Sequence, residues 1–173
     1  MKILRTQVLN VYYRLKVSLV WDWWCLLPVN KKSLDWISMA EEDLNDAKAD
    51  YSEGRYASSV FHAELCAQKS LKSLIVALGF EPGKTHRPSL ILKALITSGL
   101  VNLREELMQE LNKLISLSLV LEDQGVTPRY GWETVERIIK PSEIYDETKA
   151  RLLINNAIEV LKITKKIIGE LDC

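Results

Sequence analysis

Hydrophobic residues recur at steps of three or four along most of this chain, which is the spacing of one buried face of an α-helix. The clearest run begins at Arg55 and ends at Gly79, where a glycine can adopt the left-handed conformation that stops a helix. Its expected inward positions are Val60, Ala63, Ala67, Leu71, Leu74 and Leu78. The pattern predicts a central helix, and the small residues Ala63 and Ala67 would let another helix approach it closely.

The same spacing predicts helices in four other segments. These are Ser33–Tyr51, Pro88–Ile96, Asn102–Leu121 and Ser142–Leu171. Ser33 and Asn102 are the expected caps of their helices, because their side-chain oxygens can accept hydrogen bonds from the free amides of a first turn. Glu105, three residues after Asn102, completes the spacing of a capping box.

Two segments near the C-terminal third carry no long helical pattern. The segment Glu122–Gly131 contains two glycines and a proline and is predicted to be a loop, while Trp132–Lys140 is predicted to form a brief helix that Pro141 ends. No stretch alternates apolar and polar residues between turn signals, so no sheet is expected. The chain is therefore predicted to be all-α, an up-and-down helical bundle of four long helices plus one or two short ones.

Residues 1–30 differ from the rest, so the chain is divided into this N-terminal extension and a bundle domain of residues 31–173. The extension contains Trp21, Trp23 and Trp24, side chains that suit a membrane surface or a protein interface. Three interpretations stay open: an extra helix docked on the bundle, a contact with a partner or membrane, and a start that does not belong to the native protein.

Composition narrows the class of protein. The 173 residues include 23 basic and 23 acidic side chains, so the net charge is zero and there is no signal for non-specific DNA binding. Residues 31–53 hold three basic and seven acidic side chains, whereas residues 55–93 hold six basic and two acidic. This asymmetry indicates either an acidic and a basic face or simply a solvated surface.

The three cysteines, Cys25, Cys66 and Cys173, are far apart and show neither zinc-ligand spacing nor an even disulfide set. No metal or cofactor is therefore expected, and a reducing cytoplasm is the simplest location. No run reaches the length of about eighteen apolar residues that a membrane span needs, so no clear span is expected.

The central segment also resembles the signature of the HEPN domain family. The residues that carry this resemblance are Phe61, His62, Ala63, Gln68, Lys69, Leu71, Lys72, Gly79, Lys84, Thr85 and His86. Pro128-Arg129-Tyr130 resembles a motif of many small prokaryotic members, and the similarity extends in order and spacing from about Ser33 to Leu171. The resemblance implies the same helical fold and, as in toxin–antitoxin pairs, a minimal nucleotidyltransferase as a protein partner.

Ribonucleases of this family resemble one another in an Arg-x(4–6)-His motif in the C-terminal half, where the arginine holds phosphate and the histidine assists the attacking hydroxyl. This chain has two histidines, His62 and His86, and none follows His86. Arg55 and His62 match the spacing by lying about two helical turns apart, but on a different helix from the family motif. They are low-ranking catalytic candidates beside the preferred interpretation, a coincidence of spacing in which His62 is structural.

A basic loop is the better candidate for a ligand site. Lys84, Thr85, His86 and Arg87 immediately precede a helix that Pro88 opens, and a helix N-terminus offers free amides and partial positive charge to a phosphate. The alternative is that His86 caps the helix while Lys84 is merely solvated. For Arg129 and Tyr130, the alternatives are contact with a ligand or a role in holding their loop.

Two functions follow from these observations. The first is a binding module that recognises a nucleotide or RNA, pairs with a minimal nucleotidyltransferase, or does both. The alternative is a metal-independent ribonuclease whose active site departs from the family pattern. A homodimer is expected in either case, because Ala63 and Ala67 permit close helix contact and the tryptophans of the extension offer apolar surface.

Overall fold

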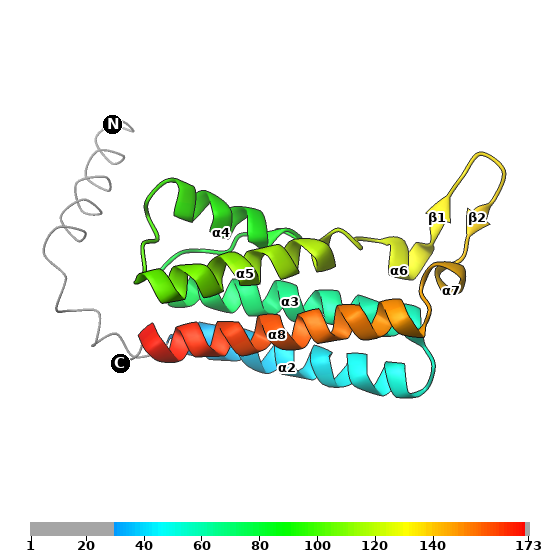
Figure 1. Ribbon diagram of the computed structural model, residues 1–173, viewed down its shortest axis with the longest axis horizontal. Helices are drawn as coiled ribbons and strands as arrows, with labels where there is room; N and C mark the ends of the chain where they lie inside the picture. Colours follow the sequence, from blue (N-terminus) through cyan, green and yellow to red (C-terminus); the bar gives the residue numbers. More distant parts are fainter. Residues whose placement is uncertain (1–29, 172–173) are drawn as a thin grey trace, which may run out of the picture.

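The computed structural model describes residues 30–171, which form a bundle of long helices lying side by side (Figure 1). The four long helices are α2 (Lys31–Ser52), α3 (Tyr56–Ala77), α5 (Glu105–Glu122) and α8 (Glu147–Leu171). The predicted all-α fold class and its four long helices are confirmed. No described helix is long and apolar enough to cross a membrane. The predictions made for the N-terminal extension fall almost entirely outside the described residues.

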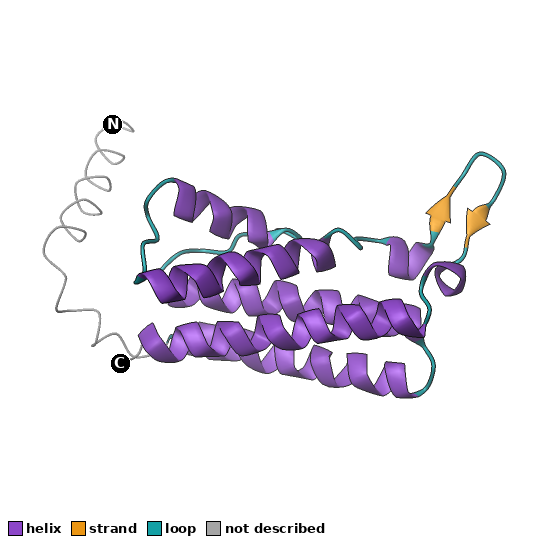
Figure 2. Ribbon diagram, in the orientation of Figure 1, coloured by secondary structure: helices purple, strands orange, loops and turns teal. Residues whose placement is uncertain are grey.

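The short elements correct three predictions. They are α4 (Pro88–Thr97), α6 (Thr127–Tyr130), β1 (Trp132–Glu133), β2 (Ile138–Ile139) and α7 (Pro141–Ile144). The segment predicted as a brief helix is an antiparallel β-hairpin, so the expectation of no sheet was wrong (Figure 2). The predicted loop before the hairpin contains α6, and the predicted last helix is divided by an extended residue, Tyr145, into α7 and α8.

The hairpin forms because its turn residues favour it over a helix. The Thr134 N–H donates to the Arg137 carbonyl at 2.9 Å, and the Thr134 hydroxyl donates to the same carbonyl at 2.7 Å. Gly131 has a φ of 75°, and a Cβ there would lie 2.1 Å from the Ile139 carbonyl oxygen. Only glycine fits this position, because another residue would meet both a strained backbone and a steric clash.

The helix caps differ from those predicted. The Asn30 side-chain oxygen accepts the Lys32 N–H at 2.9 Å and caps α2, whereas Ser33 is fully buried. The Ser33 hydroxyl instead lies 2.9 Å from the Ser73 hydroxyl and so joins α2 to α3. The capping box at Asn102 does not form, because the chain has no helical structure over residues 101–104 and α5 begins later, at Glu105.

Helix α3 is central, as predicted, because it contacts every other described helix. Its largest contact is with α2, where small residues bring the two backbones together. Those residues are Ala40 and Ala47 of α2 and Ala63 and Ala67 of α3, all fully buried. Ala63 and Ala67 are thus covered by helices of the same chain and offer no surface to a second one. The homodimer stays a prediction, but it needs a different contact.

A bulky side chain in this close contact is expected to destabilise the protein. Ala63→Leu should lower the free energy of unfolding by about 1–3 kcal/mol, because overpacking forces displaced side chains or backbone. Ala49→Leu, on the exposed face of α2, is the matched control and should change it by no more than about 0.5 kcal/mol. Urea denaturation measures both changes, and equal effects of the two variants would contradict the close packing around Ala63.

Candidate functional site

A buried carboxylate at the corner between α2 and α3 gathers several polar side chains. Asp50 is 5% exposed and accepts hydrogen bonds from Arg55 Nε at 2.9 Å and from the Ser58 hydroxyl at 2.5 Å. His62 Nδ1 lies 3.0 Å from Asp50 Oδ2, the oxygen that also accepts the Ser58 hydroxyl. The structure therefore brings Arg55 and His62, which the sequence pairs only by spacing, to one carboxylate.

The charge of Asp50 is set by these contacts. Burial raises the pKa of Asp50, but hydrogen bonds from Ser58, Arg55 and His62 lower it, and the net direction is below the ordinary value. Asp50 is therefore an anion in the folded protein. Hydrogen bonding to the charged form is what compensates for the loss of water around it.

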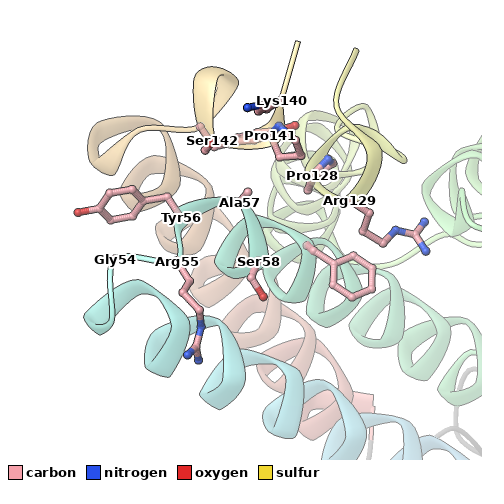
Figure 3. A pocket seen from close by; sticks show the side chains of 12 residues that line it. Gly54, Arg55, Tyr56, Ala57, Ser58, Pro128, Arg129, Lys140, Pro141 and Ser142 are labelled. Atoms are coloured by element: carbon pink, nitrogen blue, oxygen red, sulfur yellow. The ribbon is translucent and has the colours of Figure 1, made fainter. Parts of the chain in front are cut away.

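Next to this corner lies a cavity of about 750 Å³ at the end of the bundle, here called the end pocket. Its walls come from the start of α3, from α6 and from α7 (Figure 3). The lining residues are Gly54, Arg55, Tyr56, Ala57, Ser58, Phe61, Pro128, Arg129, Lys140, Pro141, Ser142 and Tyr145. Three of these are cations and three are aromatic, so the end pocket combines positive charge with apolar surface.

Residues 56–58 in the first turn of α3 line the same pocket and have free amides. The N–H groups of Tyr56, Ala57 and Ser58 have no acceptor in the described part of the chain. Such amides, at the positive end of a 22-residue helix dipole, favour an anion. The pocket therefore presents donors from the main chain as well as from side chains.

The three cations of the end pocket are not equally available. The Arg55 side chain points toward α2, where it pairs with Asp50 and Glu53 (Figure 3). The Arg129 guanidinium lies 4.8 Å from the centre of the Phe61 ring and 5.4 Å from that of Tyr130. Neither Arg129 nor Lys140 forms an ion pair within residues 30–171. These two are the cations that a ligand could engage without breaking an internal ion pair.

The predicted basic loop has a different environment. The Arg87 guanidinium pairs with Asp123, and the Thr85 hydroxyl accepts the Arg87 N–H at 2.9 Å. The side chain of Glu122, the last residue of α5, reaches the first turn of α4. Its carboxylate accepts hydrogen bonds there from the Ser89 N–H, at 3.1 Å, and from the Ser89 hydroxyl.

An internal carboxylate thus already takes the place that a phosphate was expected to take. Lys84 and His86 are exposed, and no residue of this loop lines the end pocket. The phosphate site at Lys84, Thr85, His86 and Arg87 stays a prediction. Of the two residues grouped with them, Arg129 lines the end pocket and Tyr130 lies beside it.

A second buried carboxylate lies further along α3. Burial raises the pKa of Glu64 to about 7, although a hydrogen bond from Gln68 at 3.0 Å and the charge of Arg129 both act to lower it.

The Tyr145 hydroxyl donates to the Gln124 side chain at 3.1 Å, and burial raises the pKa of Tyr145 to about 12. Among residues 30–171, no group of three or more His, Cys, Asp or Glu side chains could hold a metal ion.

Comparison with known proteins agrees with this architecture. The HEPN domain matches residues 33–168 of the chain. This chain belongs to the HEPN domain family. It is 28% identical over 134 residues to the Methanocaldococcus jannaschii protein named "Putative toxin MJ1304", covering 78% of this chain and 86% of that protein.

Two solved structures are similar to this HEPN protein. ST0689, an archaeal HEPN homologue, has 27% identity and a TM-score of 0.56, covering 79% of this chain and 97% of that one. TT1696 from Thermus thermophilus has 23% identity and a TM-score of 0.58, with 78% and 97% covered. The likeness to TT1696 is one of fold alone.

The sequence alone did not point to Asp50 or Lys140 as site residues of this HEPN protein. A signal for Asp50 was present, because it lies three residues after Ala47 on the seam that α2 buries, where an acidic residue is unexpected. No comparable signal marked Lys140, because its place in the pocket depends on the hairpin that brings residues 131 and 140 together.

The buried Glu64 is expected to make stability depend on pH. Its folded pKa of about 7 lies above its ordinary value of 4.5, so its contribution to stability is complete below pH 4.5 and is lost as the pH rises through 7. A difference of this size corresponds to about 3 kcal/mol. Glu64→Gln should therefore reduce the loss in the free energy of unfolding between pH 4.5 and 7.5.

The buried Glu122, whose pKa is also raised by burial, should leave a smaller loss of the same sign. Glu42→Gln, on the exposed side of α2, is the control and should leave the pH profile unchanged. Denaturant titrations across this pH range measure the effect. If the free energy of unfolding of Glu64→Gln changed with pH as that of the unmodified protein does, the raised pKa of Glu64 would be contradicted.

Proposed function

We propose that this HEPN protein is a binding module of the toxin–antitoxin type whose end pocket takes a phosphate-bearing ligand, a nucleotide or RNA. The observation that carries the proposal is that residues 56–58, whose amides have no acceptor in the described part of the chain, line the same pocket as Arg129 and Lys140. Phosphate oxygens accept hydrogen bonds from both kinds of donor. The apolar walls, which include Tyr56 and Phe61, suit the flat face of a base.

The strength expected of such a site is moderate. Hydrogen bonds in which one partner is charged each contribute about 1.5–3 kcal/mol, and water and salt reduce this at an open cavity. The ligand should therefore bind weakly enough for salt to compete with it.

The similarity to a protein named a toxin supports the second half of the proposal, a protein partner. A minimal nucleotidyltransferase is the partner that the family resemblance suggests, and a cytoplasmic location accords with such a pair. Partner and phosphate-bearing ligand are separate parts of the proposal, and the ligand can be tested on the purified chain alone.

Titration with ATP and with a short RNA oligomer, followed by NMR, tests the ligand site. Signals of residues 55–58 and 128–141 should shift, and Lys140→Ala combined with Arg129→Ala should weaken binding at least tenfold. Lys48→Ala, an exposed lysine of α2 without an ion pair in the described region, is the control and should bind as the unmodified protein does. Binding should also weaken as salt rises.

Shifts confined to Thr85–Leu90 would instead place the ligand at the basic loop and overturn the pocket assignment. If the double variant bound the ligand with unchanged affinity, Arg129 and Lys140 would not be ligand-binding residues, and the pocket assignment would again be overturned.

The second candidate function is a ribonuclease, which one observation favours. Asp50 holds His62 through Nδ1, an arrangement that fixes the imidazole and leaves Nε2 for another partner, with Arg55 on the same carboxylate. Against it, Arg55 is engaged by Asp50 and Glu53, and His62 does not line the end pocket.

We expect no RNA cleavage above background, and we expect His62→Ala to lower stability, since it removes a hydrogen bond from the buried Asp50. His86→Ala, which changes an exposed histidine, should do neither. A fluorescent RNA substrate and thermal denaturation provide the two measurements. Cleavage that disappears in both Arg55→Ala and His62→Ala, while the variants remain folded, would establish the enzyme.

A further inference from the structure

A buried carboxyl group lies on the face of α3 that lines the end pocket, one step further along the helix. Ala57 and Phe61 line the pocket, and Glu64 follows them at the spacing of one helical face. Glu64 is only 4% exposed. The proposed function does not use this side chain, yet a charge at this position acts on any ion that enters the pocket.

Glu64 has few partners for a carboxyl group that is away from water. The Gln68 side-chain amide donates one hydrogen bond to it at 3.0 Å, and Glu64 forms no ion pair within residues 30–171. A single amide donor compensates poorly for the water that an ionised carboxylate loses on burial. Glu64 therefore needs either a proton or a nearby cation.

Arg129 is the cation that acts on Glu64. Burial raises the pKa of Glu64 to about 7, and the positive charge of Arg129 opposes this rise. The Arg129 guanidinium lies against the ring of Phe61, one turn of α3 before Glu64. The same guanidinium lines the end pocket, where it is one of the two cations available to a ligand. Glu64 and an anionic ligand therefore depend on the same arginine.

The other titratable groups that face Glu64 add no positive charge. Glu122, from α5, carries a carboxylate that raises the pKa of Glu64. Tyr145, which lies between α7 and α8 and lines the pocket, has a pKa that burial and the charge of Glu64 raise to about 12. Tyr145 thus stays neutral at physiological pH, and its hydroxyl donates to Gln124. An ionised Glu64 consequently relies on Arg129.

We propose that Glu64 regulates the end pocket through its proton: a phosphate-bearing ligand binds tightly when Glu64 is protonated and more weakly when it is ionised. This regulation rests on the proposed function. A phosphate beside Arg129 repels an ionised Glu64 and also engages the cation that stabilises it, so binding raises the pKa of Glu64. By reciprocity, protonation of Glu64 strengthens binding to the same extent. The protein therefore takes up protons from solvent as the ligand binds.

The affinity for a short RNA oligomer without a terminal phosphate, measured at constant ionic strength from pH 6 to pH 8.5, tests this regulation. Internal phosphodiesters keep their charge over this range, whereas a terminal phosphate titrates near pH 6 and would obscure the effect. The unmodified protein should bind about fivefold more weakly at the upper end of the range. Glu64→Gln, which cannot ionise, should bind equally well throughout and more tightly than the unmodified protein at pH 8.5.

Two variants exclude other sources of the pH dependence. Glu42→Gln, on the exposed side of α2, is the matched control and should respond to pH as the unmodified protein does. His62→Gln should also keep the response. If the response disappeared in His62→Gln and persisted in Glu64→Gln, the titrating group would be the histidine and the proposal would be overturned. Circular dichroism checks that each variant is folded.

Proton uptake is measured by calorimetry of RNA binding at pH 7.5, in two buffers that differ in their enthalpy of ionisation. The unmodified protein should take up protons on binding, and Glu64→Gln should take up less than half as many. Equal uptake by the two proteins would overturn the proposal.

A titration without ligand separates the regulation from the proposed function. NMR of the Glu64 side-chain carboxyl should show a higher pKa in Arg129→Gln than in the unmodified protein, because the opposing positive charge is lost. An unchanged pKa would overturn the regulation even if RNA binds in the end pocket. A raised pKa in a protein that binds no RNA at pH 6 would refute the phosphate site and the regulation with it. RNA binding of equal strength at every pH would support the proposed function and overturn the regulation alone.

Discussion

The buried Asp50 carboxylate is the constraint on which the end of this bundle depends. An ionised carboxylate away from water requires several donors, and Arg55, Ser58 and His62 provide them from the first two turns of α3 and the residue before it. The Arg55 N–H also donates to the Asp50 carbonyl at 2.8 Å, which closes the turn between α2 and α3. One residue of α2 therefore holds the start of α3 through both its side chain and its main-chain carbonyl.

Polar contacts at both ends of α2 and α3 enclose a seam of small residues. Ser33 and Ser73 hydrogen-bond to one another at the far end, and the fully buried alanines between allow close approach. Dispersion contacts along such a seam are individually weak but numerous, while the polar ends specify the register of one helix against the other. Because α3 contacts all other described helices, this register affects the whole bundle.

The N-termini of α3 and α4 show how the same local chemistry can lead to opposite outcomes. Each helix begins with amides that need an acceptor and with an arginine beside them. At α4 the chain itself provides carboxylates, Glu122 for Ser89 and Asp123 for Arg87. At α3 the Asp50 carboxylate engages side chains, and the amides of residues 56–58, which line the end pocket, have no acceptor in the described part of the chain. Whether the amides at the start of a helix are free to bind a ligand therefore depends on the carboxylates that the neighbouring helix places beside them.

The sequence by itself determined the fold class, the four long helices and the central place of α3, because the period of apolar residues states which face of each helix is buried. It also offered Arg129 as a candidate for ligand contact or for holding its loop, and Arg55 and His62 as low-ranking catalytic candidates. Only the tertiary structure decided the β-hairpin, the capping of α2 by Asn30, and the end pocket with Asp50 and Lys140. These features depend on contacts between residues separated in the chain, such as Gly131 with Ile139 and Ser33 with Ser73. The spacing of apolar residues along the sequence carries no information about the energies of such contacts.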